Sequence, residues 1–193
     1  ISTILRENRA GFRLSLPQGL WLHGTYDAVV LSGSVSLTCP LPTIEGEHRI
    51  DLPNSIGTAI VTRIGNWQVK TELVPEYSQI EYGQNNTFVP AELTAFLDAG
   101  SLRNGVWVRT RQSGDRFQPL GMHHEKKLQD FFTDSKVPRD WRDRVPLLVS
   151  GQGIAWVVGH RIAEWAKVGA GKAGETAVLR IDVCEQSRDA EGP

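Results

Sequence analysis

Short stretches in which polar and apolar residues alternate, separated by glycine and proline, dominate this sequence and leave little room for long helices. Nineteen glycines and ten prolines are spread over the 193 residues. Residues 44–83 show no apolar residues at helical spacing, whereas 58–61 and 67–73 have the pattern of strands between glycine-bearing turns. Because alternation with a period of two is typical of half-buried strands, the pattern predicts a mostly β protein.

The second half of the chain contains clearer elements. Residues 106–111 alternate, and one face of the expected strand carries Trp107, Arg109 and Arg111. Residues 126–134 have apolar side chains at helical spacing, which predicts a short amphipathic helix, and Pro138 opens a second helical turn over 139–144. Two apolar stretches, 147–149 and 154–158, flank a glycine-rich turn and predict a β-hairpin covered on both sides.

These elements predict an α+β fold that is mostly β, with a small β-rich unit over residues 36–98 followed by a compact mixed α/β domain over 99–184 that has two short helices. Residues 1–35 are interpreted as the remnant and linker of a preceding domain, and the polar tail 185–193 is expected to be disordered. A further short helix is expected over residues 90–97. The predicted core of the second domain consists of eight apolar residues: Leu128, Phe131, Phe132, Trp141, Leu147, Leu148, Trp156 and Val158.

Composition excludes several classes of protein. No apolar run reaches the roughly 18–20 residues of a membrane span, and the N-terminus has no signal-peptide layout, so a protein without a membrane role is expected. Cys39 and Cys184 are the only cysteines and lie far apart, which fits a reducing, cytoplasmic environment. The chain starts at Ile1 and its one methionine is Met122, so we expect it to be a piece of a longer protein.

Positive charge is concentrated in one segment although the net charge of the chain is −1. Residues 101–161 contain eleven Lys and Arg against six Asp and Glu, whereas the rest of the chain contains ten against sixteen. Such an asymmetry is the electrostatic footprint of a protein that binds a polyanion through one segment. The charge distribution therefore favours nucleic acid as a partner.

The first candidate site combines Arg109, Arg111 and Arg116 around a turn that contains Gly114 and Asp115. Arginine suits phosphate because its planar guanidinium donates to two oxygens at once. Asp115 is expected to orient the arginines or to cap the turn. The alternative, a strand edge that carries charge only for solubility, remains open.

A second group of candidate RNA-binding residues follows in the chain. It consists of six basic residues: Lys126, Lys127, Lys136, Arg139, Arg142 and Arg144. Four interleaved aspartates allow simple pairing along a solvated helix instead, so RNA contact and a solvated surface are both open from spacing alone.

No catalytic or metal-binding set is visible in the sequence. Residues 169–176 resemble a phosphate loop, but Lys172 is followed by Ala173, where Ser or Thr is required. His123 and His124 lack the spacing of a helical zinc site, and His160 is isolated and expected to be structural. A small hydrolase that uses His123 or His124 is the weakest of the functional interpretations.

Residues 96–162 resemble the C-terminal domain of tRNA(Ile)-lysidine synthetases. The blocks that carry the resemblance occur in the same order as in the family. They are residues 96–98 (FLD), 108–111 (VRTR), 114–117 (GDRF), 119–122 (PLGM), 126–132 (KKLQDFF), 136–138 (KVP), 142–143 (RD), 146–149 (PLLV), 156–159 (WVVG) and 161–162 (RI). Looser similarity covers residues 14–27 and 56–75, while His123 and His124 stand where the family has small residues.

The resemblance implies an ATP-dependent carbon–nitrogen ligase of tRNA processing and modification, located in the cytoplasm. Such enzymes convert the wobble cytidine of tRNA(Ile) with a CAU anticodon to lysidine, using ATP and lysine. The ATP site, with its Mg²⁺, is expected in an N-terminal domain outside this chain, so no catalytic residue and no cofactor are assigned here. The family's C-terminal domain is similar to a module of the phenylalanyl-tRNA synthetase β chain, so a protein-interaction scaffold is the alternative, and a homodimer stays open.

Overall fold

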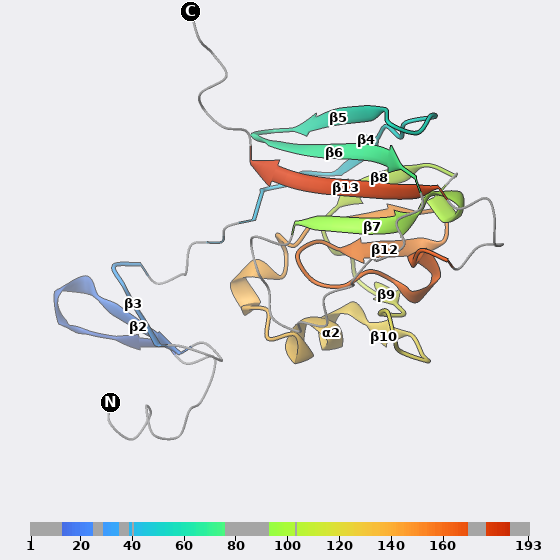
Figure 1. The fold of residues 1–193 in the computed structure, drawn as a ribbon. Coiled ribbons are helices and arrows are strands. Elements are labelled where there is room, and N and C mark those ends of the chain that lie inside the picture. Colours follow the sequence, from blue (N-terminus) through green and yellow to red (C-terminus); the bar gives the residue numbers. More distant parts are fainter. Residues whose placement is uncertain are drawn as a thin grey trace, which may run out of the picture.

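The computed structural model describes residues 13–24, 29–34, 39, 41–75, 93–102, 104–169 and 177–185, and within them the chain is built almost entirely of antiparallel strands (Figure 1). The expected loop over 168–174, apart from its first two residues, and the tail beyond Glu185 lie outside the described residues. The prediction of a mostly β fold is confirmed.

Two four-stranded sheets form the body of the molecule. One sheet has the order β12-β11-β8-β4, and its strands are β12 (Gly153–Val157), β11 (Leu147–Ser150), β8 (Val106–Arg109) and β4 (Glu47–Ile50). The other has the order β5-β6-β13-β7, and its strands are β5 (Ala59–Ile64), β6 (Trp67–Val74), β13 (Val178–Glu185) and β7 (Thr94–Asp98). The predicted hairpin over 147–158 is β11 and β12, and most of its residues are buried, as expected for strands covered on both sides.

Both sheets combine strands from the two halves of the chain. β8 pairs with β4, and β13 pairs with both β6 and β7. The sheets therefore cross the predicted boundary between residues 98 and 99. Apolar side chains of both sheets join one hydrophobic cluster, which extends from Cys39 to Val183. Of the two cysteines, Cys39 is buried and Cys184 is exposed.

A small layer at one end of the sheets carries the candidate site. It consists of the two-stranded ladder β9 (Arg116–Phe117) and β10 (Lys126–Lys127), followed directly by helix α2 (Leu128–Asp134). Leu128, Phe131 and Phe132 point into the core from α2, as their spacing predicts. Phe131 packs edge-on against Phe117, with ring centroids 5.0 Å apart. In Figure 1, this layer lies at the opposite end of the domain from strand β5.

The helix predictions are only partly confirmed. α2 is an α-helix, but the second expected helix is a short 3-10 turn at Arg139–Trp141, and the helix expected over 90–97 is wrong because Thr94–Asp98 forms strand β7. Alternating burial of Ala95 and Leu97 against β13 fixes that segment as a strand. Seven of the eight predicted core residues are buried, and Trp141 packs against the cluster while half-buried. No helix in the described part of the chain is long and apolar enough to cross a membrane.

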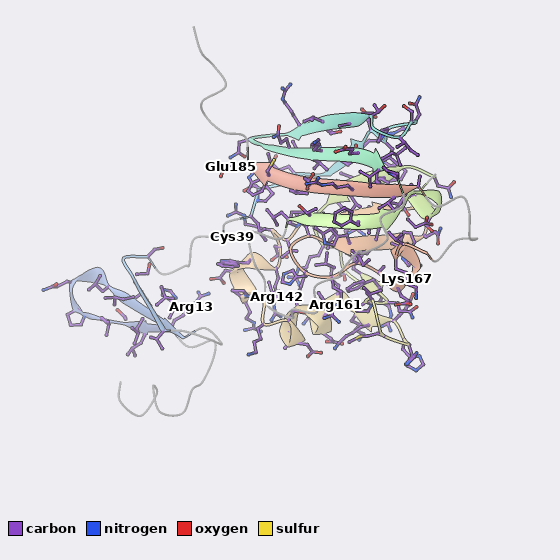
Figure 2. All side chains as sticks on the ribbon, viewed as in Figure 1. Arg13, Cys39, Arg142, Arg161, Lys167 and Glu185 are labelled. Carbon is purple, nitrogen blue, oxygen red and sulfur yellow. The ribbon has the colours of Figure 1, made fainter. Side chains whose placement is uncertain are left out.

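A separate three-stranded sheet precedes the main body. It contains β1 (Arg13–Ser15), β2 (Trp21–Gly24) and β3 (Val29–Ser32), in that order. Figure 1 shows it beside the two large sheets and outside them. Arg13, on the side facing the main body in Figure 2, forms an ion pair with Asp140 of the 3-10 turn.

Candidate nucleic-acid interface

The loop that joins β8 to β9 is held in place by Asp115. Its carboxylate accepts hydrogen bonds from both terminal nitrogens of Arg109, at 2.8 and 2.9 Å, and from the backbone N–H of Gln112 at 2.8 Å. The turn between them passes through Gly114 at φ +88°, a conformation that glycine adopts without strain. Asp115 therefore shapes the turn and anchors the arginine, which are the two roles expected of it.

Arg109 does not lie on an exposed surface. Its side chain and that of Asp115 are each only 13% exposed. Burial alone would raise the pKa of Asp115, but the hydrogen bonds from Arg109 and Gln112 and the charge of Arg109 outweigh it, so the pKa lies below its usual value. Arg109, a candidate phosphate contact in the sequence, instead directs its guanidinium into the loop, because the Asp115 carboxylate accepts hydrogen bonds from both of its terminal nitrogens.

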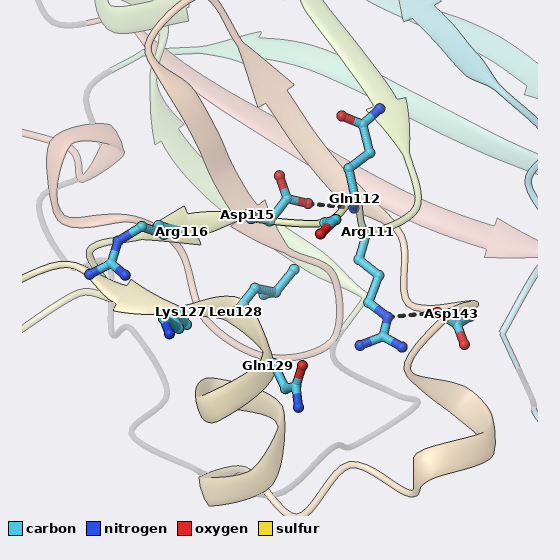
Figure 3. Close-up of a pocket in the computed structure, with 10 residues that line it drawn as sticks. Arg111, Gln112, Asp115, Arg116, Lys127, Leu128, Gln129 and Asp143 are labelled. Carbon is cyan, nitrogen blue, oxygen red and sulfur yellow. Dashed lines mark hydrogen bonds and ion pairs between the residues drawn. The ribbon is translucent and has the colours of Figure 1, made fainter.

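Arg111 has a different environment from Arg109. Its Nε donates to Asp143 Oδ1 at 2.6 Å, while the Arg111 side chain is 30% exposed and that of Asp143 is 73% exposed. Within the described part of the chain this ion pair uses only the Nε edge of the guanidinium. In Figure 3 the guanidinium of Arg111 lies between Asp143 and Gln129.

Arg116 and Lys127 are direct cross-strand partners in the β9–β10 ladder. Like charges placed opposite each other in a ladder repel. The carboxylate of Glu125 lies 3.6 Å from Arg116 Nε, with both side chains largely exposed, and Lys127 forms no ion pair with any described residue. Two positive side chains thus lie side by side, and only the exposed carboxylate of Glu125 offsets their charge, so this position favours a bound anion.

These three cations surround one pocket of about 630 Å³. Its wall consists of residues from the β8–β9 loop, the β9–β10 ladder, the start of α2 and the segment after the 3-10 turn: Arg111, Gln112, Ser113, Gly114, Asp115, Arg116, Lys127, Leu128, Gln129 and Asp143. Figure 3 shows Arg116 and Lys127 at one side of this space and Arg111 at the other. The structure therefore brings together two arginines, one after β8 and one in β9, and a lysine of β10.

The remaining basic residues are distributed around this pocket. Lys126 pairs with Asp134 at the end of α2, and Lys136 follows the helix on the surface. Arg139 is exposed, whereas Arg142 is half-buried and donates from Nε to the carbonyl of Val137 at 3.1 Å. None of these four lines the pocket.

Arg144 serves the fold. It is half-buried and donates to the carbonyl oxygen of Leu41, which ties the segment before β4 to the second half of the chain. This hydrogen bond gives Arg144 a structural role, and its contact with RNA stays a prediction. The sequence did not predict the hydrogen bond to Leu41. Residues 139–144 form a 3-10 turn and the segment after it, so their side chains do not follow the α-helical spacing that was assumed for them.

The histidines show no catalytic arrangement. His160 is largely buried beside Phe131, and burial lowers its pKa from 6.5 to about 4. His123 and His124 are exposed on a loop whose backbone is held by a hydrogen bond from the Gly121 N–H to Glu164, 2.8 Å long. Among the described residues, no three His, Cys, Asp or Glu side chains gather in a way that would hold a metal ion.

Sequence reasoning missed the uncharged wall of the pocket. Gln112, Ser113 and Gln129 line it, together with Asp143. Gln129 carried one weak signal, since it is a polar residue in the first turn of α2, next to the buried Leu128. The position of Asp143 carried none, because its contact with Arg111 spans 32 residues.

Comparison with known proteins assigns a family to the second half of the chain. Residues 106–181 match the TilS substrate C-terminal domain. The chain is 40% identical over 173 residues to a tRNA(Ile)-lysidine synthase of Dehalococcoides mccartyi, which covers 90% of this chain and 34% of that protein. It is 32% identical over 183 residues to a tRNA(Ile)-lysidine synthase of Geobacter sulfurreducens, covering 92% of this chain and 34% of the relative. The chain thus spans about a third of the length of these relatives.

The fold also has a solved counterpart. A crystal structure of a TILS C-terminal domain superimposes with a TM-score of 0.55 and 22% identity, covering 74% of this chain and 98% of that one. At this identity the likeness concerns the fold alone. It agrees with a mostly β architecture that carries one helix among the described residues.

Proposed function

Residues 106–181 are a TilS substrate C-terminal domain, which confirms the family recognised in the sequence, and from this premise we propose that the chain is the tRNA-handling part of a tRNA(Ile)-lysidine synthase. The single observation that carries the proposal is the pocket flanked by Arg111, Arg116 and Lys127. Phosphates of RNA are the polyanion that such a cluster fits.

The proposed RNA surface is smaller than the set of basic residues chosen from the sequence. Arg111, Arg116 and Lys127 form its centre, and Lys126, Lys136, Arg139 and Arg142 extend it around α2. Arg109 shapes the loop from within, since Asp115 already satisfies its guanidinium. Repulsion between Arg116 and Lys127 supports this assignment, because a phosphate placed between them would remove the repulsion.

The activity proposed for the whole protein follows its relatives. A tRNA(Ile)-lysidine synthase would convert the wobble cytidine of tRNA(Ile) with a CAU anticodon to lysidine, in the cytoplasm, and ATP, Mg²⁺ and lysine would bind in a part of the protein outside this chain. We propose that this chain by itself neither hydrolyses ATP nor adenylates tRNA. Release of AMP or ADP by the pure chain, followed by chromatography, would contradict that.

Binding of labelled tRNA to the chain, measured by fluorescence anisotropy over a salt series, tests the tRNA-handling role. If about four to six phosphates are contacted, the affinity should fall by roughly two orders of magnitude or more between 50 and 200 mM salt. A scaffold module similar to that of phenylalanyl-tRNA synthetase predicts little tRNA affinity and no dependence on salt. Weak binding that is insensitive to salt would therefore remove the tRNA-handling role and leave the family assignment in place.

A further inference from the structure

The concave shape of the pocket fits a ligand other than the backbone of an RNA double helix. A double helix presents its phosphates on a convex surface, which a flat basic surface contacts well. The pocket is an open concave space lined mostly by exposed residues, and its volume of about 630 Å³ lies within the roughly 300–1,000 Å³ range of small-molecule sites. The part of an RNA that enters such a space is an unpaired nucleotide, whose base is free to leave the stack.

The two sides of the pocket differ in chemistry. Arg116 and Lys127, side by side in the β9–β10 ladder, supply positive charge at one side. At the other side lie the Arg111 guanidinium and the uncharged side chain of Gln129. Guanidinium planes stack on bases, and a carboxamide both donates and accepts hydrogen bonds, so this side suits a base edge rather than a phosphate.

The carboxylates of the pocket do not cancel this polarity. Asp115 is occupied by Arg109 and the Gln112 amide, so its charge is balanced inside the loop. Asp143 lies at the rim, largely exposed, and holds the Nε edge of Arg111. That contact occupies the Nε edge of the guanidinium and leaves its two terminal nitrogens outside the ion pair.

We propose that this pocket holds one unpaired nucleotide of the bound RNA, with its phosphate between Arg116 and Lys127 and its base against Arg111 and Gln129. This inference rests on the proposed function and adds the class of ligand. Because the contacts combine two cations on one side with a guanidinium plane and a carboxamide on the other, phosphate and base must both be present for tight binding.

The test titrates the ¹⁵N-labelled chain with the four nucleoside 5′-monophosphates, the four nucleosides and inorganic phosphate, followed by two-dimensional NMR. At least one nucleotide is expected to bind at least ten-fold more tightly than both its nucleoside and inorganic phosphate. The signals that shift should include the side-chain amide of Gln129 and the backbone amides of 112–116. If inorganic phosphate binds as tightly as every nucleotide, or if no nucleotide binding saturates, the proposal is overturned.

Substitution of Gln129 separates the base contact from the charge. Gln129→Ala should weaken nucleotide binding at least five-fold and leave the binding of inorganic phosphate unchanged, and Gln129→Glu should weaken both. Gln152→Ala, at an exposed glutamine outside the pocket, is the matched control and should change neither. The spectra themselves verify that each variant is folded. Equal nucleotide affinity of Gln129→Ala and the wild type would overturn the base contact.

Failure of this inference is distinguishable from failure of the proposed function. The same samples are measured against labelled tRNA over the salt series. If tRNA binds with a steep salt dependence while nucleotides bind no better than phosphate, the RNA surface stands and the nucleotide pocket is rejected. If neither tRNA nor nucleotides bind, both proposals are rejected.

Discussion

Lys127 lies directly opposite Arg116 in the β9–β10 ladder, at the rim of the pocket that Arg111 borders from the other side. Two neighbouring cations of this kind lower stability in the absence of a ligand and raise affinity for an anion. Binding residues often lower stability while they raise ligand affinity, because the position of such a charge suits the bound ligand and is unfavourable in the folded protein alone.

Lys127→Gln should therefore affect stability and binding in opposite directions. Removing the repulsion with Arg116 should leave the free energy of unfolding unchanged or increase it by up to about 1 kcal/mol at low salt. The affinity for tRNA should fall in the same variant. Chemical denaturation and anisotropy measure the two quantities, and Lys126→Gln, which loses a partner in Asp134, serves as the comparison. A clear loss of stability in Lys127→Gln would show that the lysine supports the fold.

Arg109→Ala and Arg111→Ala should differ sharply in stability although the two arginines are two residues apart. Arg109→Ala leaves Asp115 partly buried without its partner and should cost about 3 kcal/mol. Arg111→Ala breaks an exposed pair with Asp143 and should cost less than about 1 kcal/mol. Urea denaturation of both variants measures the difference. Equal costs would mean that the Arg109–Asp115 pair does not anchor the loop.

Phe131→Ala tests the packing that positions the pocket. The ring contacts Phe117 of β9 and lies beside His160, so its removal opens a cavity beneath the β9–β10 ladder. The expected loss is about 3–5 kcal/mol in the free energy of unfolding. Thr133→Ala, at an exposed position of the same helix, should change stability by less than about 0.5 kcal/mol. A loss below about 1 kcal/mol for Phe131→Ala would contradict the assigned helix face.

Acid should destabilise the protein through His160 before it affects the carboxylates. The unfolded chain binds a proton at this residue below about pH 6.5, whereas the folded chain does so only near pH 4, so stability falls as the pH drops through that window. The full effect is about 3 kcal/mol. The lowered pKa of Asp115 adds a further loss only below its usual value of 3.8.

His160→Phe keeps an aromatic ring beside Phe131 and cannot titrate. Its unfolding free energy should depend much less on pH between 6.5 and 4 than that of the wild type, as measured by urea denaturation at a series of pH values. Identical pH profiles for the two proteins would show that His160 is not the group responsible.

Local patterns predicted the elements of this fold better than their assembly. Alternation identified β6 and β8, the glycine-rich turn identified the hairpin of β11 and β12, and apolar spacing identified α2. The pairing of β13 with β6 was not predictable, because it joins residues more than 100 positions apart and nothing in either strand specifies its partner. For this reason the boundary expected at residue 98 does not separate the sheets.

The candidate site was predicted as a charged segment and not as a pocket. Spacing placed Arg109, Arg111 and Arg116 together. It does not reveal that Arg109 forms an ion pair with Asp115, or that Arg144 donates a hydrogen bond to the Leu41 carbonyl. A sequence shows which residues carry charge, whereas the ion pairs that neutralise them depend on tertiary contacts. Gln112 and Gln129 of the pocket carry no charge, so the charge pattern that marked the segment could not reveal them.

The most direct test of the RNA surface compares two double variants in tRNA binding over a salt series. Arg116→Ala with Lys127→Ala removes the two cations at the pocket, and Arg63→Ala with Lys70→Ala removes an arginine and a lysine from β5 and β6 at the far end of the domain. The first should bind tRNA more weakly and lose about two phosphate contacts from the slope of log K against log salt, while the second should match the wild type. If both double variants, or neither, reduced the slope, the pocket would not be the RNA-binding surface.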